Sequence, residues 1–260
     1  MSKQFIINDE TAGDDLYPAT FGRGHDPSQV VPCMFAPPAE IPLVPESEWV
    51  PRIRDRKKYK TGLRDLYDAG RAGKIKDQNG QGYCWAYSLV RTCEYVRAAM
   101  GLEYTALSAH SVACKVKNFR DEGGWCGLSA QFVRANGVAP ESLWPAKSMS
   151  RGHDTPAAWE EGRKYRITED FVDLTRAAWD QDLTWQQVVS CLLQNIPVVA
   201  DLNWWGHSVC YVDVDVIDGE VCPDLDNSWT ESWGDKGTAR LQGRRKYPDG
   251  AVATRVLNPA

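Results

Sequence analysis

The sequence has no long hydrophobic run and no excess of positive charge. No apolar stretch approaches the roughly 20 residues that span a bilayer. Near the amino terminus only Phe5-Ile6-Ile7 is apolar, where a signal peptide needs about 7–15 such residues. The net charge of −5 argues against a nucleic-acid coat or a general binder of anionic membranes. We therefore expect no nucleic-acid or membrane partner and a cytoplasmic location, with association to a larger assembly as an alternative.

The sequence also lacks recognisable metal and disulfide patterns. Its eight cysteines include no C-x-x-C pair, which disfavours a structural zinc site or a thioredoxin-like site. The default is a set of reduced, mostly buried thiols, one of which does chemistry. Acidic residues near a turn lack the ligand spacing of a calcium loop: Asp213, Asp215, Asp218, Glu220, Asp224 and Asp226. We predict no metal and no cofactor, and we expect these acids to face solvent.

The hydrophobic pattern predicts helices first and strands second. With 43% hydrophobic residues in 260, the chain can bury the core of one large domain or two lobes. Apolar residues recur at spacings of three and four, and later alternate with polar ones. Helices are predicted at 84–100, 108–117, 128–135 and 185–194, and strands at 198–202, 212–216 and 221–225. Ser108 is a candidate cap for the second helix, Asn136-Gly137 ends the third, and Asp218-Gly219 is a hairpin turn signal. This order predicts an α+β fold with two lobes.

Residues 1–59 form a proline-rich segment that we expect to be an extended arm. Eight of the fifteen prolines lie before residue 52, and proline fixes φ and removes a backbone donor. Residues 52–76 then carry ten Lys/Arg against three Asp. We interpret this basic run as a solvated surface, with a docking patch as the alternative.

Cys84 is the strongest candidate for a reactive thiol. It begins a predicted helix, where the partial positive charge and free amides of the helix terminus stabilise a thiolate. A thiolate nucleophile needs a histidine to protonate the leaving group. Of the four histidines, His207 opens a hydrophobic strand that would fix it, whereas His110 in the first turn of a helix fits a surface role. Asn227 ends the returning hairpin strand, where it could orient His207.

These residues stand in motifs that resemble those of papain-like cysteine peptidases. Residues 76–88, Lys-Asp-Gln-Asn-Gly-Gln-Gly-Tyr-Cys-Trp-Ala-Tyr-Ser, resemble the nucleophile segment of that family. The other matches follow in family order: Gly123-Gly124-Trp125, Gly206-His207-Ser208-Val209, and the block Asn227-Ser228-Trp229 that continues to Gly237. Each motif alone is weak, but together they cover roughly residues 60–258.

The resemblance implies a two-lobed fold and a mechanism. The fold would have a helical lobe at 60–150, a lobe with an antiparallel sheet or barrel at 151–260, and the active-site cleft between them. Cys84 would attack a peptide carbonyl, His207 would act as acid and base, and Asn227 would orient His207. Gln78 and the Cys84 N–H would hold the oxyanion. Substrate contacts are implied at Gly123, Gly124, Trp125, Gly206 and Trp229, and the partner would be a peptide or protein substrate.

Three departures from the family pattern leave questions open. Gln81 stands where many relatives have a half-cystine, and Cys114 finds no partner cysteine, so the family's disulfides are not reproduced. Trp204-Trp205 replace a longer excursion before the histidine, and either fill the specificity pocket or make it flat. The arm at 1–59 is shorter than the family's usual propeptide. It could lie along the surface, cross the cleft as an inhibitory strap, or dock a partner.

Two alternatives to a hydrolytic peptidase remain. The first is a transpeptidase or amide ligase with the same Cys84 acyl-enzyme but an amine acceptor. The second is a papain-fold binding or structural module with little turnover, anchored by the arm.

Overall fold

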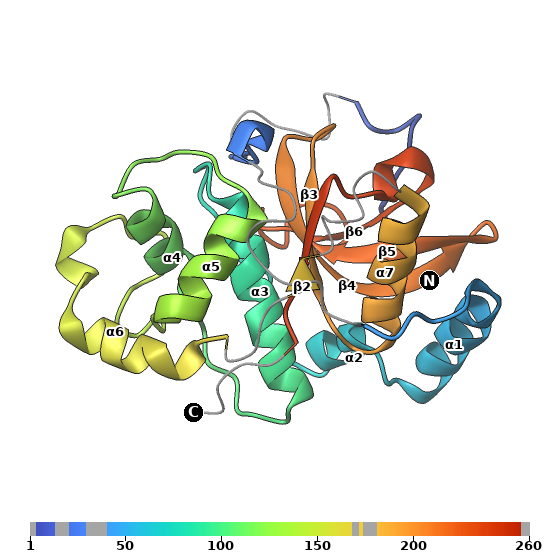
Figure 1. The fold of residues 1–260 in the computed structure, drawn as a ribbon, viewed down its shortest axis with the longest axis horizontal. Coiled ribbons are helices and arrows are strands. Elements are labelled where there is room, and N and C mark those ends of the chain that lie inside the picture. Colours follow the sequence, from blue (N-terminus) through green and yellow to red (C-terminus); the bar gives the residue numbers. More distant parts are fainter. Residues whose placement is uncertain (1–3, 14–20, 30–40, 168–171, 174–180, 256–260) are drawn as a thin grey trace.

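The computed structural model describes residues 4–13, 21–29, 41–167, 172–173 and 181–255, which form two halves (Figure 1). One half is helical, and the other is built on a seven-stranded sheet. The predicted α+β two-lobed architecture is confirmed. No helix among these residues is both long and apolar enough to cross a membrane.

The helical half is organised around α3 (Cys84–Ala99), which is buried on nearly every side. Helices α4 (Ala109–Val116), α5 (Cys126–Asn136) and α6 (Pro156–Gly162) complete it. The Ser108 side chain caps α4 by accepting from the Ser111 N–H, and Gly137 ends α5 with a positive φ, as the sequence predicts. Short 3-10 turns lie at Arg151–His153 and Arg163–Tyr165.

The other half is a mixed sheet in the order β1-β6-β5-β4-β3-β7-β2. Its strands are β1 (Ile6–Ile7), β2 (Val172–Asp173), β3 (Val198–Leu202), β4 (His207–Ile217), β5 (Glu220–Asp226), β6 (Thr238–Leu241) and β7 (Gly250–Ala253), with a 3-10 turn at Gly243–Lys246. Neighbouring strands pair antiparallel except β1 with β6. The hairpin at Asp218-Gly219 joins β4 to β5, as predicted.

Both faces of the central strands are buried. On β4, Val209 and Tyr211 pack with α1 (Glu46–Tyr59) and α7 (Gln181–Leu193), whereas Cys210 and Val212 face α2 (Leu63–Asp68) and the end of α3. Alternate side chains of β4 therefore pack into two separate hydrophobic cores, one on each face of the sheet. This packing fixes the start of β4, and with it His207, between the halves.

Two predicted boundaries are corrected by the structure. Residues 46–59 are not extended, because they form α1 with Pro51 inside it, and Trp49 and Ile53 pack into the sheet's core. The boundary between lobes also does not fall at 150/151. Ala158, Tyr165 and Ile167 belong to the core of the helical half.

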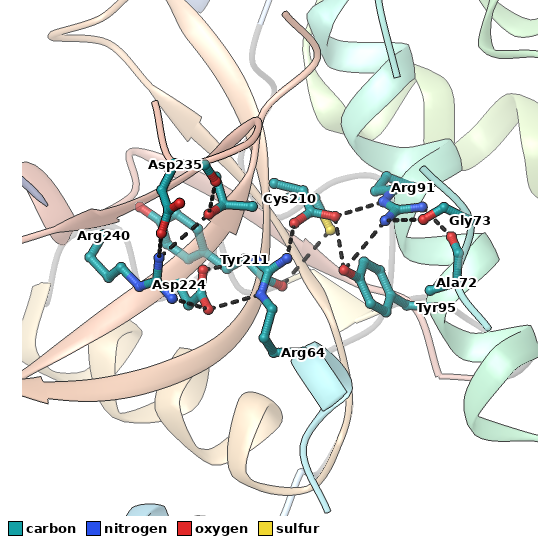
Figure 2. A network of polar contacts seen from close by, with 12 residues as sticks. Arg64, Ala72, Gly73, Arg91, Tyr95, Cys210, Tyr211, Asp224, Asp235 and Arg240 are labelled. Atoms are coloured by element: carbon teal, nitrogen blue, oxygen red, sulfur yellow. Dashed lines mark hydrogen bonds and ion pairs between the residues drawn. The ribbon is translucent and has the colours of Figure 1, made fainter. Parts of the chain in front are cut away.

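The prediction that the acidic residues near the turn face solvent holds for Asp218 but is wrong for Asp215, Asp224 and Asp226, which are buried. Asp226 accepts from the Arg91 Nε at 2.7 Å and pairs with Arg64 at 2.6 Å, and Asp224 pairs with Arg64 and Arg240 (Figure 2). These carboxylates are about 96% buried or more. Within the described residues, no three His, Cys, Asp or Glu side chains are grouped as metal ligands. The acids instead neutralise arginines between the sheet and helices α2 and α3.

Candidate active site

Cys84 is the first residue of α3 and is fully buried. Its position at the helix terminus is the one expected to favour a thiolate. Burial nevertheless outweighs this effect and raises the pKa of the Cys84 thiol to about 11, although N–H donors from Ser208 and Gly24 oppose the rise. The thiol is therefore neutral near pH 7 in this arrangement.

His207 and Asn227 are joined by a direct hydrogen bond. The Asn227 Oδ1 lies 2.8 Å from the His207 Nε2 and also accepts from the Ser228 N–H, so it acts as an acceptor and His207 donates from Nε2. The His207 Nδ1 is buried without a hydrogen-bond partner among the described residues and is left as the basic nitrogen. The Trp229 ring stacks on the imidazole with centroids 4.4 Å apart. Burial lowers the pKa of His207 to about 3.

Gln78 is held between the nucleophile segment and the Asn227 block. Its backbone N–H donates to the Ser228 carbonyl, and its Oε1 accepts from the Ser228 hydroxyl. Its Nε2 donates to the Gln81 carbonyl and, at 2.7 Å, to the carbonyl of Gly22. The side-chain amide is thus fixed with its donor facing a carbonyl oxygen from the amino-terminal region.

That carbonyl belongs to residues 21–29, which we call the closing segment. This segment runs between the two halves, and its 3-10 turn at Pro27–Gln29 appears in blue at the top of Figure 1. Gly124 donates to the Gly24 carbonyl at 2.7 Å and accepts from the Asp26 N–H at 2.8 Å, so His25 forms a parallel bridge with Gly124. On the opposite side, the Gly206 carbonyl accepts from the His25 N–H at 3.2 Å.

The closing segment lies directly against the candidate catalytic groups. The Gly24 N–H donates to the Cys84 Sγ at 3.3 Å. The Gly22 carbonyl also accepts from the Trp229 Nε1 at 3.0 Å, and the Phe21 ring stacks on Trp229 with centroids 5.2 Å apart. The groups predicted to act on a substrate backbone are therefore occupied by the chain itself.

The two glycines of this segment are required by its close fit. A Cβ at Gly24 would lie 2.0 Å from the Gly82 carbonyl oxygen, and one at Gly22 would lie 2.2 Å from that of Gln81. Both obstacles are backbone atoms of the loop before Cys84, which cannot rotate away as a side chain can. Any larger residue at either position must displace the segment.

Four of the five predicted substrate-contact residues lie against the closing segment, and the fifth, Trp125, has its side chain in a hydrophobic core. Gly124, Gly206 and Trp229 contact the closing segment, and a Cβ at Gly123 would lie 2.7 Å from the Gly24 carbonyl oxygen. The Trp125 side chain is 2% exposed and packs in the core of the helical half.

The sequence predicts that Trp204 and Trp205 either fill the specificity pocket or make it flat. In the structure they belong to an aromatic cluster beside the His207 imidazole. Their rings stack on each other, and Trp205 meets His207 edge-on at 5.1 Å and Trp229 at 5.5 Å. The Trp205 carbonyl accepts from the Arg23 guanidinium. This cluster excludes water from one side of His207.

Two histidines behave differently from the sequence-based interpretation. His110 is fully buried rather than on the surface, bonded to the Tyr87 hydroxyl and to the Gln81 Oε1 at 2.8 Å each, and burial lowers its pKa to about 4. This chain of hydrogen bonds supports the loop at Gln81, the position where the sequence departs from the family pattern. His25, which the sequence placed only in the arm, is 7% exposed and lies in the site.

The comparisons with known proteins identify the family. Residues 62–257 match the model of the papain family cysteine proteases. Mexicain from Jacaratia mexicana is 26% identical over 70% of this chain and 90% of its own length. Stem bromelain from Ananas comosus is 31% identical over 68% of this chain and 86% of its own. The solved structure of xylellain, a cysteine protease from Xylella fastidiosa, aligns with a TM-score of 0.64 at 16% identity, covering 91% of this chain and 97% of that one.

The chain is a cysteine hydrolase by fold and sequence. It belongs to the papain family of cysteine proteases, and its substrates are peptides or proteins.

Proposed function

We propose that this protein is a peptidase that uses Cys84 as nucleophile and is held latent by its own closing segment. The observation that carries the proposal is the set of contacts around residues 22–24. Cys84, Gln78 and Trp229 all bond to the backbone of that stretch. The His207 imidazole, which is hydrogen-bonded to Asn227, stacks against Trp229. A peptide backbone is the ligand that these groups are arranged to receive.

The reaction follows from the hydrogen-bond directions. With Nε2–H bonded to Asn227, the free Nδ1 of His207 takes the Cys84 proton, and the thiolate attacks the substrate carbonyl carbon. Gln78 Nε2–H and the Cys84 backbone N–H hold the developing oxyanion. His207 gives its proton to the departing amine, and a thioester remains. Water, deprotonated by His207, then attacks the thioester and releases the acid and the thiol.

The closing segment prevents these steps in two ways. It presents an amide N–H of Gly24 to the sulfur rather than a carbonyl carbon, so it offers nothing to attack. It also buries both reacting groups, which raises the pKa of Cys84 and lowers that of His207, and so disfavours the thiolate–imidazolium pair. When the segment leaves, water returns and both shifts diminish.

The test is to displace the segment by a single methyl group in the full chain. In Gly24→Ala the Cβ meets the Gly82 carbonyl, whereas in the control Gly13→Ala the Cβ meets nothing within 4 Å. We expect Gly24→Ala to raise the rate of Cys84 alkylation by iodoacetamide about tenfold or more, since 1.4 kcal/mol of lost contact corresponds to tenfold. It should also cleave a fluorogenic peptide library, and Gly24→Ala with Cys84→Ala should not. Selective alkylation of another cysteine, or none in Gly24→Ala, contradicts the proposal.

The same variant separates the two alternative functions. Addition of an amine nucleophile diverts the acyl-enzyme to an amide product if the protein is a transpeptidase or ligase, and exclusive hydrolysis excludes that alternative. A binding or structural module would show neither product, even with Cys84 accessible. The possible docking partner of residues 1–59 stays a prediction of the same kind, tested by association of the full chain with and without its first 50 residues.

We further propose that the protein works in a reducing compartment such as the cytoplasm. The seven cysteines within the described residues are all buried and free: Cys84, Cys93, Cys114, Cys126, Cys191, Cys210 and Cys222. Its stability should therefore not change when dithiothreitol is added. A loss of stability with reductant would contradict the proposal.

A further inference from the structure

His25 occupies a pocket beside Gly124 that is built from acceptor oxygens. Gly124 bonds the Gly24 carbonyl and the Asp26 N–H on either side of His25, and the Gly206 carbonyl accepts from the N–H of His25 itself. Its imidazole is fully buried, with Nε2 2.7 Å from the Asn203 Oδ1 and Nδ1 3.7 Å from the Asp201 Oδ2. The Nδ1 has no hydrogen-bond partner within the described residues. Both ring nitrogens therefore face oxygens, and a neutral imidazole can donate to only one of them.

Asp201 is a fixed anion at the base of this pocket. Its side chain is fully buried on β3, where the Ser208 hydroxyl donates to Oδ1 and the Cys126 N–H donates to Oδ2 at 3.0 Å. These donors stabilise a carboxylate, and within the described residues the His25 imidazole is the only basic group that lies in ion-pair range of it. A buried carboxylate in this position favours a positively charged side chain.

The charged groups around the pocket also bear on its preference for a positively charged side chain. Asp249 accepts from the Asn203 N–H at 2.7 Å and adds a second carboxyl at the rim; burial raises the pKa of Asp249 above its usual value, although this N–H and then His25 oppose the rise. Two arginines of the described residues contact the neighbouring tryptophans: the Arg23 guanidinium donates to the Trp205 carbonyl, and Arg245 pairs with Asp9 and lies over the Trp204 ring. The pocket thus has a net negative character.

A substrate peptide must use the same backbone groups once the closing segment leaves. The N–H and C=O of Gly124 bond the residues on either side of His25, and the C=O of Gly206 bonds His25 itself. The residue opposite Gly124 therefore directs its side chain toward Asp201. We propose that this pocket selects a cationic side chain, so that the preferred substrates carry Lys, Arg or protonated His opposite Gly124. This inference rests on the proposed peptidase function for its substrate, but the chemistry of the pocket can be tested without turnover.

The first test measures hydrogen–deuterium exchange of the closing segment in full-length variants, corrected for intrinsic amide rates. We expect His25→Lys to keep the protection of residues 21–29 within about twofold, and His25→Glu to lose about tenfold or more, since like charges repel in a buried site. Asn203 lies at an exposed turn, and the added change Asn203→Asp should widen the difference in protection between His25→Lys and His25→Glu. The added change Asp201→Asn should narrow that difference. Exchange elsewhere, for example in α7, reports whether each variant is folded. Equal protection in His25→Lys and His25→Glu would overturn the inference.

The second test profiles cleavage by the Gly24→Ala protein on a positional-scanning peptide library. A preference for basic residues at one position, strengthened by Asn203→Asp and weakened by Asp201→Asn, is the expected result. Cleavage with no basic preference overturns the pocket assignment but not the peptidase. Absence of both cleavage and Cys84 alkylation overturns the proposed function, and the exchange experiment then still decides the pocket.

Discussion

The backbone N–H of Gly24 donates to the Cys84 sulfur at 3.3 Å, so the candidate nucleophile of this chain is bonded to the chain itself. Sixty residues separate the two in sequence. The contact is flanked by hydrogen bonds from Gln78 and Gly124 to the Gly22 and Gly24 carbonyls. One short stretch therefore bonds both the sulfur of Cys84 and the side chain of Gln78, the proposed oxyanion donor. Variants can separate its effect on access to Cys84 from its effect on the proposed chemistry.

Gln78→Ala should change access and chemistry in opposite directions. The variant removes the donor to the Gly22 carbonyl and loosens the closing segment, so Cys84 should be alkylated several-fold faster than in the wild type, because one such hydrogen bond contributes about 1 kcal/mol. It also removes a proposed oxyanion donor, so kcat in the Gly24→Ala background should fall about 10²–10³-fold. The measurements are alkylation kinetics and peptide turnover. A fall in both rates together would assign Gln78 a purely structural role.

Phe21→Ala should open the site without impairing the chemistry. The Phe21 ring stacks on Trp229 at an interplanar angle of 8°, and an aromatic pair contributes about 1 kcal/mol beyond its buried area. We expect Cys84 alkylation to rise about fivefold or more, with kcat unchanged in the Gly24→Ala background. The matched control is Phe119→Ala, which removes a ring stacked on Trp144 in the helical half. If both variants speed alkylation equally, the effect is general destabilisation rather than release of the segment.

The sequence predicts the helix and strands that carry the candidate residues well because their signals are local. Spacings of three and four after Cys84 indicate a helix that begins there, and the structure has α3 from Cys84 to Ala99. The predicted strand at 198–202 is β3, and the Asp218-Gly219 turn joins β4 to β5. A cap, a turn and an apolar period each depend on residues close in the chain, so one sequence suffices.

The features that the sequence does not predict depend on contacts with residues distant in the chain. The alternation of Asp213 and Asp215 with valines is typical of a half-exposed strand, but Arg56 and Lys57 of α1 pair with these two carboxylates. On the next strand, Asp224 pairs with Arg64 of α2. His25 gives no local signal, because its partners Gly124 and Asn203 come about 100 and 180 residues later. The nearest signal is the Gly22-Arg23-Gly24 pattern, which allows a close backbone approach but does not say to what.

Acid should destabilise the closed protein through two buried histidines. Burial lowers the pKa of His207 to about 3 and that of His110 to about 4, against 6.5 for an exposed imidazole. The unfolded chain therefore binds these protons first, so the stabilisation is fully present above pH 6.5 and is lost as the pH falls toward 4 and 3. Between pH 7.5 and 4.5 the free energy of unfolding should fall by on the order of 2 kcal/mol per histidine.

Urea unfolding at the two pH values measures this loss. The variants His207→Gln and His110→Gln should each reduce the difference between pH 7.5 and 4.5, and the double variant should reduce it most. If His110→Gln leaves the difference unchanged, the hydrogen bonds of His110 to Tyr87 and Gln81 survive its protonation, and the predicted contribution of that residue is wrong.

Asp226→Asn should be among the most destabilising single changes in the chain. Burial alone would raise the pKa of Asp226, but Arg64 and Arg91 outweigh it and hold that pKa below its usual value. Removing the Asp226 charge leaves the two buried guanidiniums without one of their carboxylate partners. Such a change typically lowers the free energy of unfolding by about 3–5 kcal/mol. The network joins α2 and α3 to the sheet (Figure 2), so the substitution should weaken the packing of these helices against the sheet.

The matched control for this prediction is Glu48→Gln, which removes the acidic partner of Arg52 in an exposed ion pair on α1. That change should cost no more than about 0.5 kcal/mol, because exposed pairs are solvated and screened. Both are measured by urea unfolding, with Asp226→Glu as a charge-preserving variant if Asp226→Asn does not fold. Equal costs for Asp226→Asn and Glu48→Gln would mean that water reaches the network and that its arginines do not depend on Asp226.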